Sequence, residues 1–193
     1  MMGGDWKSNE RKKMNAGNLL ERMIKAMATK PEEVFVIIEE SLGRVDVTIR
    51  AVPVDSRRLV GQGGQTISAI SIIASALWHP KAVKVHRIES VGEDSKEWEP
   101  FTDKLELWHA GAGKVVTEII RELVRGCFRN DFEIMTTKVS PAMISMKIAV
   151  VIGEMGLSKA ERIASAIARV VPVISTNQGM YVDVAIEAKG HQG

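Results

Sequence analysis

Residues 57–67 decide the fold of this chain and read Arg57-Arg58-Leu59-Val60-Gly61-Gln62-Gly63-Gly64-Gln65-Thr66-Ile67. An apolar pair leads into a loop that has glycine at its first and fourth positions. Glycine has no Cβ, so a loop of this kind lets another backbone approach closely. The N–H groups and the dipole at the start of the following helix favour an anion. The stretch therefore predicts a loop between two short helices that docks a phosphodiester backbone.

The segments on either side of this loop predict short helices. After the loop, apolar residues recur at helical spacing as far as Leu77, and the helix is expected to end near His79-Pro80. Before the loop, Pro53 stops a strand, and Asp55 or Ser56 is expected to cap the short helix that follows. A further amphipathic helix is expected from Asn18 to the residues before Pro31.

Three strands are expected around these helices. Residues 34–38 form a β-rich run, and Leu42-Gly43-Arg44 is typical of a turn. Residues 45–50 alternate between apolar and polar side chains, which indicates a strand with one buried face. Residues 82–88 are the third expected strand. The order is thus helix, strand, strand, helix, glycine loop, helix, strand.

This order, together with the apolar pair before the Gly-x-x-Gly loop, resembles a type II KH domain, a nucleic-acid-binding module. The resemblance covers about residues 18–90. Residues 30–34, Lys-Pro-Glu-Glu-Val, and residues 59–64 are especially similar to the small bacterial KH RNA-binding proteins. In those proteins too, a Pro-Glu-Glu turn follows the first helix and an apolar pair precedes the loop.

The resemblance implies roles for the loop and its flanks. Gly61 and Gly64 match the two fixed glycines, and Gln62 and Gly63 fill the variable positions, where the family usually carries Lys or Arg and this chain carries none. Charge is therefore expected from Arg57-Arg58, one helical turn earlier. An apolar groove for about four unstacked nucleotides is implied beside the loop. The implied interface is Arg57, Arg58, Val60, Gly61, Gln62, Gly63, Gly64, Gln65, Thr66, Ile67, Ile70, Lys84 and Arg87.

Within that groove, Val60, Ile67 and Ile70 are the implied floor. The strand with Lys84, His86 and Arg87, together with the turn near Gly43-Arg44, is the implied opposite wall. The residues themselves leave plainer interpretations open. Ile67 and Ile70 could be ordinary core, Arg57 and Arg58 could be solvated helix residues, and His86 could be a surface residue of its strand.

The second half predicts another small α+β unit. A helical region is expected over residues 101–127, strands over 132–139 and 143–152, and a further helix from Ser158. A hairpin with a turn at residues 177–179 is expected to end the chain. This order parallels the first half without one short helix, so both a degenerate KH-like repeat and an unrelated α+β domain stay open.

The expected fold class is α+β: a type II KH-like domain (αββααβ) followed by a second small α+β domain. The expected boundaries are a flexible basic arm at 1–17, the KH-like domain at 18–90, a polar linker at 91–101 and the second domain at 102–189.

Composition limits the class of function. The 193 residues carry 26 Lys and Arg against 24 Asp and Glu, so an electropositive site must arise from local arrangement. The absence of a long apolar run argues against membrane spans, and the single Cys127 is expected to be a buried apolar residue in a cytoplasmic protein. The four histidines are scattered, and we find no nucleophile motif, metal cluster or cofactor signature.

The sequence thus favours a non-catalytic protein that binds single-stranded nucleic acid, and RNA is favoured over DNA as the class of ligand. One alternative is a structural or protein-interaction module, in which the second half mediates self-association or binds a protein. Another is a single-stranded DNA-binding protein of replication or recombination.

Overall fold

The computed structural model describes residues 15–86, 89–90, 112–128, 132–140, 143–152, 156–177 and 179–190. The predicted linker (residues 91–101) and Arg87 lie outside these residues. Of the predicted arm (residues 1–17), only residues 15–17 are described. In the first half the elements are α1 (Ala16–Met27), η1 (Pro31–Glu33), β1 (Phe35–Ser41), β2 (Arg44–Ala51), α2 (Pro53–Val60), η2 (Gln62–Gly64), α3 (Gln65–Leu77), β3 (Ala82–Val85) and β4 (Glu89–Ser90).

Local sequence accounts for the start of this half. The Asn15 side chain caps α1 by accepting hydrogen bonds from the N–H groups of Gly17 (2.9 Å) and Asn18 (3.4 Å). The apolar face of α1 is buried, as its helical spacing predicts: Leu19, Leu20, Met23, Ile24 and Met27. In β2, the alternate residues Val45, Val47 and Ile49 are fully buried, so this strand presents one face to the core.

The first sheet has mixed pairing. Its main path is β1-β2-β3, in which β1 is antiparallel to β2 and β2 is parallel to β3. The short β4 also pairs with β2. The β1–β2 turn falls at the expected position, where Gly43 has φ +81°. A parallel pair needs a crossover connection, and α2 and α3 supply it between β2 and β3.

The second half consists of α4 (Ala112–Phe128), β5 (Phe132–Ser140), β6 (Met143–Ile152), α5 (Leu157–Asn177) and β7 (Tyr181–Gly190). Its sheet has the order β5-β6-β7, with β5 antiparallel and β7 parallel to β6. The pairing directions therefore repeat those of β1, β2 and β3. Only residues 153–156 separate β6 from α5, a segment shorter than the eight residues of α2.

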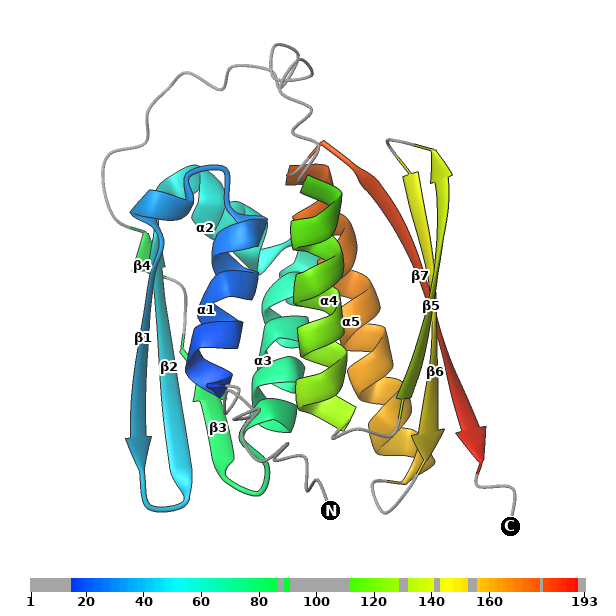
Figure 1. The fold of residues 1–193 in the computed structure, drawn as a ribbon. Coiled ribbons are helices and arrows are strands. Elements are labelled where there is room, and N and C mark those ends of the chain that lie inside the picture. Colours follow the sequence, from blue (N-terminus) through cyan, green and yellow to red (C-terminus); the bar gives the residue numbers. More distant parts are fainter. Residues whose placement is uncertain are drawn as a thin grey trace, which may run out of the picture.

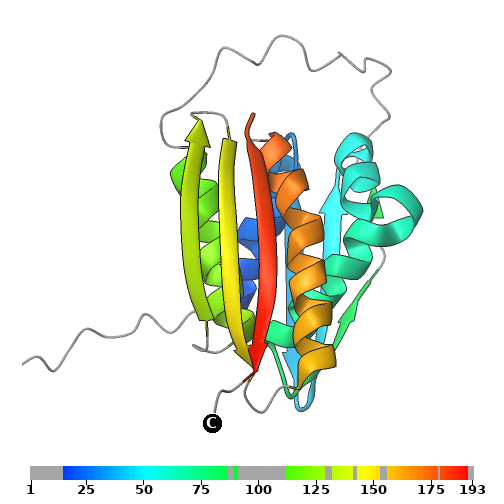
Figure 2. The same cartoon turned by 90° about the vertical axis from the view of Figure 1, so that its right-hand side faces the viewer.

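Helices fill the space between the sheets. Figure 1 shows α1, α3, α4 and α5 in a central layer, with β1, β2 and β3 on one side and β5, β6 and β7 on the other. Figure 2, turned to face the second sheet, shows α5 running beside β7. The fold is thus α+β, as predicted, and the two halves meet through their helices.

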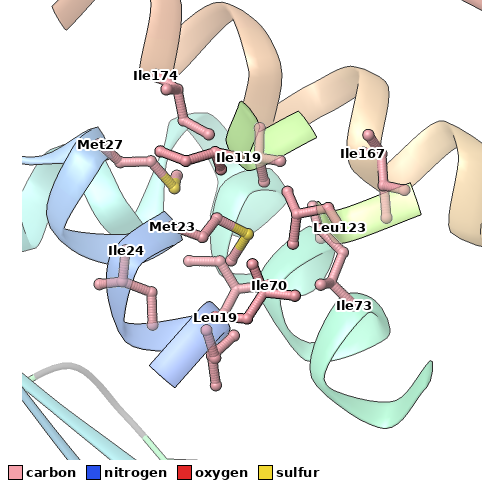
Figure 3. Close-up of a cluster of buried hydrophobic side chains, with 14 of the residues drawn as sticks. Leu19, Met23, Ile24, Met27, Ile70, Ile73, Ile119, Leu123, Ile167 and Ile174 are labelled. Atoms are coloured by element: carbon pink, nitrogen blue, oxygen red, sulfur yellow. The ribbon is translucent and has the colours of Figure 1, made fainter. Parts of the chain in front are cut away.

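Among the described residues, one hydrophobic cluster joins the halves. Figure 3 shows side chains from α1 and α3 interleaved with side chains from α4 and α5. Met23 and Ile70 of the first half and Leu123 and Ile167 of the second are all completely buried. Polar contacts reinforce the join. Arg22 of α1 forms an ion pair with Glu122 of α4 at 2.6 Å, and the Asn177 amide donates hydrogen bonds to the carbonyls of Ala26 and Ala28.

Two local predictions were wrong. The helix α5 continues to Asn177 through Pro172, so residues 173–175 are helical and the predicted terminal hairpin is absent from this part of the described chain. The N-cap of α2 is Val52, not Asp55 or Ser56. Asp55 instead accepts from Thr29 N (2.7 Å), Thr29 Oγ1 (2.9 Å) and Lys30 N (3.1 Å), and Ser56 Oγ donates to the Ala51 carbonyl.

In the described part of the chain, none of the helices combines the length and apolarity that a membrane crossing needs.

Cys127 is only 1% exposed, as expected for a buried apolar residue. Burial raises the pKa of its thiol to about 12.

Candidate nucleic-acid interface

The glycine loop joins α2 to α3 through a tight turn. Gly61 ends α2 with φ +72° and ψ 171°, and its N–H donates to the Arg57 carbonyl at 2.9 Å. Gly64 N–H donates to the Gly61 carbonyl at 3.1 Å, and Gln65 N–H donates to that of Gln62. These two N–H groups are therefore engaged inside the turn. Gly64 itself is left-handed, with φ +76°, and precedes the first residue of α3.

Gly61 is the glycine that the packing requires most strictly. A Cβ at this position would lie 2.8 Å from the Thr66 Cβ and closer still to the Thr66 hydroxyl oxygen. Thr66 is itself only 8% exposed, so it cannot easily move aside. Of the predicted interface residues, Thr66 thus packs beneath the loop and does not face outward.

The middle of the loop projects into solvent. Gln62 and Gly63 are both exposed, and a Cβ added at Gly63 would meet no atom within 4 Å. Gly63 has φ +59° and ψ 22°, a left-handed conformation that glycine adopts without steric cost. The two residues form the outermost part of the turn, where a ligand has open access.

The apolar residues predicted to form the groove floor differ in exposure. Val60 is 36% exposed and Ile67 is partly buried, so both present apolar surface next to the loop. Ile70 is 0% exposed within the hydrophobic cluster. The prediction that Ile70 contacts nucleic acid is therefore corrected, because the packing of α1 and α4 against α3 leaves it no accessible surface.

The two arginines before the loop lie in different environments. Arg57 is exposed on the last turn of α2. Arg58 is partly buried, and its Nη2 donates to the Val173 carbonyl of α5 at 3.2 Å. Desolvation lowers the pKa of Arg58, and the nearby Asp55 carboxylate partly opposes that shift. The structure thus brings Arg57 near the loop and uses Arg58 to connect the two halves.

The predicted opposite wall has an exposed cation on β3 and an ion-pair cluster centred on the neighbouring strand β2. Lys84 is exposed on β3, while Arg87 lies outside the described residues. Asp46 on β2 accepts from Arg44 and from His86, each at 2.7 Å. The hydrogen bond from Arg44 and then that from His86 hold the pKa of Asp46 below its ordinary value. The charge of Arg44 at the variable turn is therefore compensated locally.

One contact near the loop was missed by the sequence analysis. Arg169 Nη1 of α5 donates to Gln65 Oε1 at 2.9 Å, which places a cation beside the start of α3. A groove of about 470 Å³ lies farther along α3, and α5 contributes to its lining. Long-range packing of α5 on α3 creates both features. The available signal was the spacing of Lys159, Arg162 and Arg169, which share one helix face.

Comparison with known proteins does not assign a family: the chain matches no protein-family model and no curated protein. Within the described residues, no group of three or more His, Cys, Asp or Glu side chains is placed to hold a metal ion. The case for a function therefore rests on the geometry of the loop and its surroundings.

Proposed function

We propose that the chain is a non-catalytic protein that binds single-stranded nucleic acid, with RNA proposed ahead of DNA as the ligand, built on a type II KH-like first half. The observation that carries the proposal is the glycine turn between α2 and α3. Its first glycine is required by packing against Thr66, while Gln62 and Gly63 project into solvent. A turn that is rigid at its base and open at its tip suits close approach by a phosphate backbone.

The proposed mechanism assigns phosphate contact to the backbone N–H groups of Gln62 and Gly63, because those of Gly64 and Gln65 are already used in the turn. Arg57 supplies positive charge from the last turn of α2. The exposed parts of Val60 and Ile67 provide an apolar surface for unstacked bases. Single-stranded segments fit this arrangement because their bases can turn away from the backbone and contact the protein.

An alternative proposal is a protein-interaction module. The specific observation in its favour is on β1, an edge strand of the first sheet's main path, where Phe35 is 57% exposed and Ile37 is 39% exposed. Exposed apolar side chains on an edge strand favour pairing with another chain. On this alternative the fold is retained and self-association or a protein partner replaces nucleic acid.

The proposal is tested by the double substitution Gln62→Asp and Gly63→Asp, with Gln62→Asn and Gly63→Asn as the matched control. Asp and Asn have nearly the same shape and both tolerate left-handed backbone, so the pair differs mainly in charge. We expect the Asp variant to bind an unstructured RNA oligonucleotide at least about tenfold more weakly than the Asn variant, because its carboxylates repel phosphate. Fluorescence anisotropy measures both affinities.

Equal affinities of the Asp and Asn variants would show that the loop is not the site. No binding of RNA or single-stranded DNA by the unmodified chain, together with a dimer in light scattering that Phe35→Lys dissociates, would support the protein-interaction alternative.

A further inference from the structure

The groove beside α3 is formed by both halves of the chain. Ser68, Ser71 and Ser75 of α3 line it together with Val83 of β3, and α5 contributes Lys159 and Arg162. Its volume of about 470 Å³ lies in the range of pockets that hold small organic ligands. Because α5 comes from the second half, this site exists only when the two halves are packed together.

The cations on the α5 side are available for a ligand. Within the described part of the chain, neither Lys159 nor Arg162 forms an ion pair with an acidic side chain. Lys81, which also lines the groove, is by contrast held by Glu40 at 2.8 Å. Arg162 is exposed and Lys159 is partly exposed. A polyanion that enters the groove therefore meets two cations that no acidic side chain of the described residues pairs with.

These charges continue toward the glycine loop. Lys159, Arg162 and Arg169 are spaced by three and seven residues, which places them on one face of α5. The ten-residue separation of Lys159 from Arg169 corresponds to about 15 Å along the helix axis. Arg169 contacts Gln65 at the start of α3, whereas Lys159 and Arg162 lie near Ser75 toward its end. The basic face of α5 thus runs from the loop to the groove.

Several of the α3 residues that line the groove have small side chains, Ser68, Ser71, Ser75 and Ala76. Ser71 Oγ donates to the Ile67 carbonyl at 2.9 Å and Ser75 Oγ donates to the Ser71 carbonyl at 2.8 Å. Each hydroxyl donor is therefore satisfied within α3, and each oxygen keeps acceptor capacity. Serines at these positions leave space above the helix that larger side chains would fill.

We infer that α5 forms a second wall of the nucleic-acid site, with Lys159 and Arg162 binding phosphates of the same strand that docks on Gly61–Gly64. This inference rests on the proposed function and identifies the source of charge that the loop lacks. The ligand is a flexible single strand long enough to pass from the loop into the groove. The second half thereby acts as part of the interface and not only as support for the first half.

The test compares Lys159→Gln/Arg162→Gln with the control Arg121→Gln/Arg125→Gln. The control removes the same charge from exposed positions of α4, a helix that contributes no residue to the groove lining. Binding of the full chain to a fluorescent single-stranded RNA is measured at several salt concentrations. We expect the α5 variant to bind about tenfold more weakly, with a salt slope lower by about 1.4, since each lost phosphate contact removes about 0.7. We expect the control to bind as the unmodified chain does.

The outcomes separate the inference from the proposed function. If the loop Asp variant weakens binding while the α5 variant does not, the second wall is refuted and the loop site stands. Equal losses in the α5 variant and the α4 control would also refute it, because binding would then depend on total charge alone. If the unmodified chain binds neither RNA nor single-stranded DNA, both proposals fail.

A steric variant tests the same groove without changing charge. Ser75 is exposed, so Ser75→Phe fills the space above α3 without disturbing the core. We expect it to weaken RNA binding several-fold with an unchanged salt slope, and thermal unfolding checks that the fold is intact. Unimpaired binding by a folded Ser75→Phe variant would show that the strand does not enter the groove.

Discussion

Gly61 determines the shape of the glycine loop because it combines a conformation that side chains rarely adopt with a close neighbour. Its φ is +72° and ψ is 171°, and an added Cβ would overlap Thr66. Gly63 is also left-handed but has open space around it. The two glycines therefore allow conformational strain to be separated from steric overlap.

We predict that Gly61→Ala lowers the free energy of unfolding by about 2–4 kcal/mol, because strain and overlap add. Gly63→Ala is expected to cost only about 1 kcal/mol, the usual penalty for a left-handed side chain. Urea titrations of both variants measure the difference. Similar losses at the two positions would contradict the packing role given to Thr66.

Glu40 provides a prediction on pH. Its carboxylate accepts from Trp78 Nε1 at 2.9 Å and Lys81 Nζ at 2.8 Å. The hydrogen bonds from Lys81 and then from Trp78 lower its pKa below the ordinary 4.5. A carboxyl with a depressed folded-state pKa stabilises the fold above its unfolded-state pKa and loses that contribution as pH falls through the folded-state value.

The unfolding free energies of the unmodified chain and Glu40→Gln should therefore differ by a constant amount from pH 7 to about pH 5. That difference should shrink as the pH drops below 4.5, the ordinary pKa of the group. Denaturant titrations across this range measure it. A difference that widens on acidification would contradict the depressed pKa.

At the scale of elements, Asp55 fixes α2 against the connection between α1 and β1. Its carboxylate is completely buried and accepts hydrogen bonds from the backbone and hydroxyl of Thr29 and from the backbone of Lys30. Replacement by Ala would remove these bonds and leave the partly buried donors of Thr29 and the Lys30 N–H without this acceptor. Since α2 leads directly into the glycine loop, this anchor also positions the candidate site.

We predict that Asp55→Ala lowers stability by about 2–4 kcal/mol. The exposed Asp183 on β7 is the control, and Asp183→Ala should change stability by no more than about 0.5 kcal/mol. Thermal and urea unfolding measure both variants. Equal, small effects would mean that the buried carboxylate does not anchor α2.

Elements with a strong local pattern were predicted well. The alternating residues of β2, the apolar face of α1 and the turn at Gly43 each carry a short-range signal, and the structure has them where expected. The end of α5 was not predicted, because Pro172 and the β-branched pair Val173-Ile174 favour a strand locally. Packing against the first half, including the Asn177 contacts with the end of α1, accompanies the helical state there.

For the candidate site too, the local features were predicted from the sequence and the contacts between the two halves were not. The loop and its glycines were recognisable from spacing, and Gln62 and Gly63 are exposed as the loop requires. Whether Ile70 belonged to the groove or the core depended on helices distant in sequence, and it is core. The engagement of Arg58 with Val173 and the position of Arg169 beside Gln65 are contacts between the halves, which spacing alone does not reveal.

At the scale of the whole molecule, the shared core predicts cooperative behaviour. Separate domains usually meet through modest, polar interfaces and move relative to one another. Here, fully buried side chains of α1 and α3 pack against those of α4 and α5 (Figure 3). Neither half can be removed without exposing the apolar helix faces of the other.

We predict that the chain unfolds in a single transition when followed by far-ultraviolet circular dichroism and by tryptophan fluorescence. Leu123→Ala in α4 should lower stability by about 2–5 kcal/mol and shift both probes together. Two separated transitions, of which Leu123→Ala moves only one, would show that the halves fold independently.

The central claim is that the glycine loop and the adjacent groove bind single-stranded nucleic acid through its backbone. The most direct measurement compares the affinity of the chain for unstructured RNA, the matching single-stranded DNA and a duplex at two salt concentrations. We predict micromolar or tighter binding to the single strands and weaker binding to the duplex, with affinity falling as salt rises because phosphate contacts are lost. Absence of binding to every one of these ligands at micromolar protein, or a preference for duplex, would contradict the account.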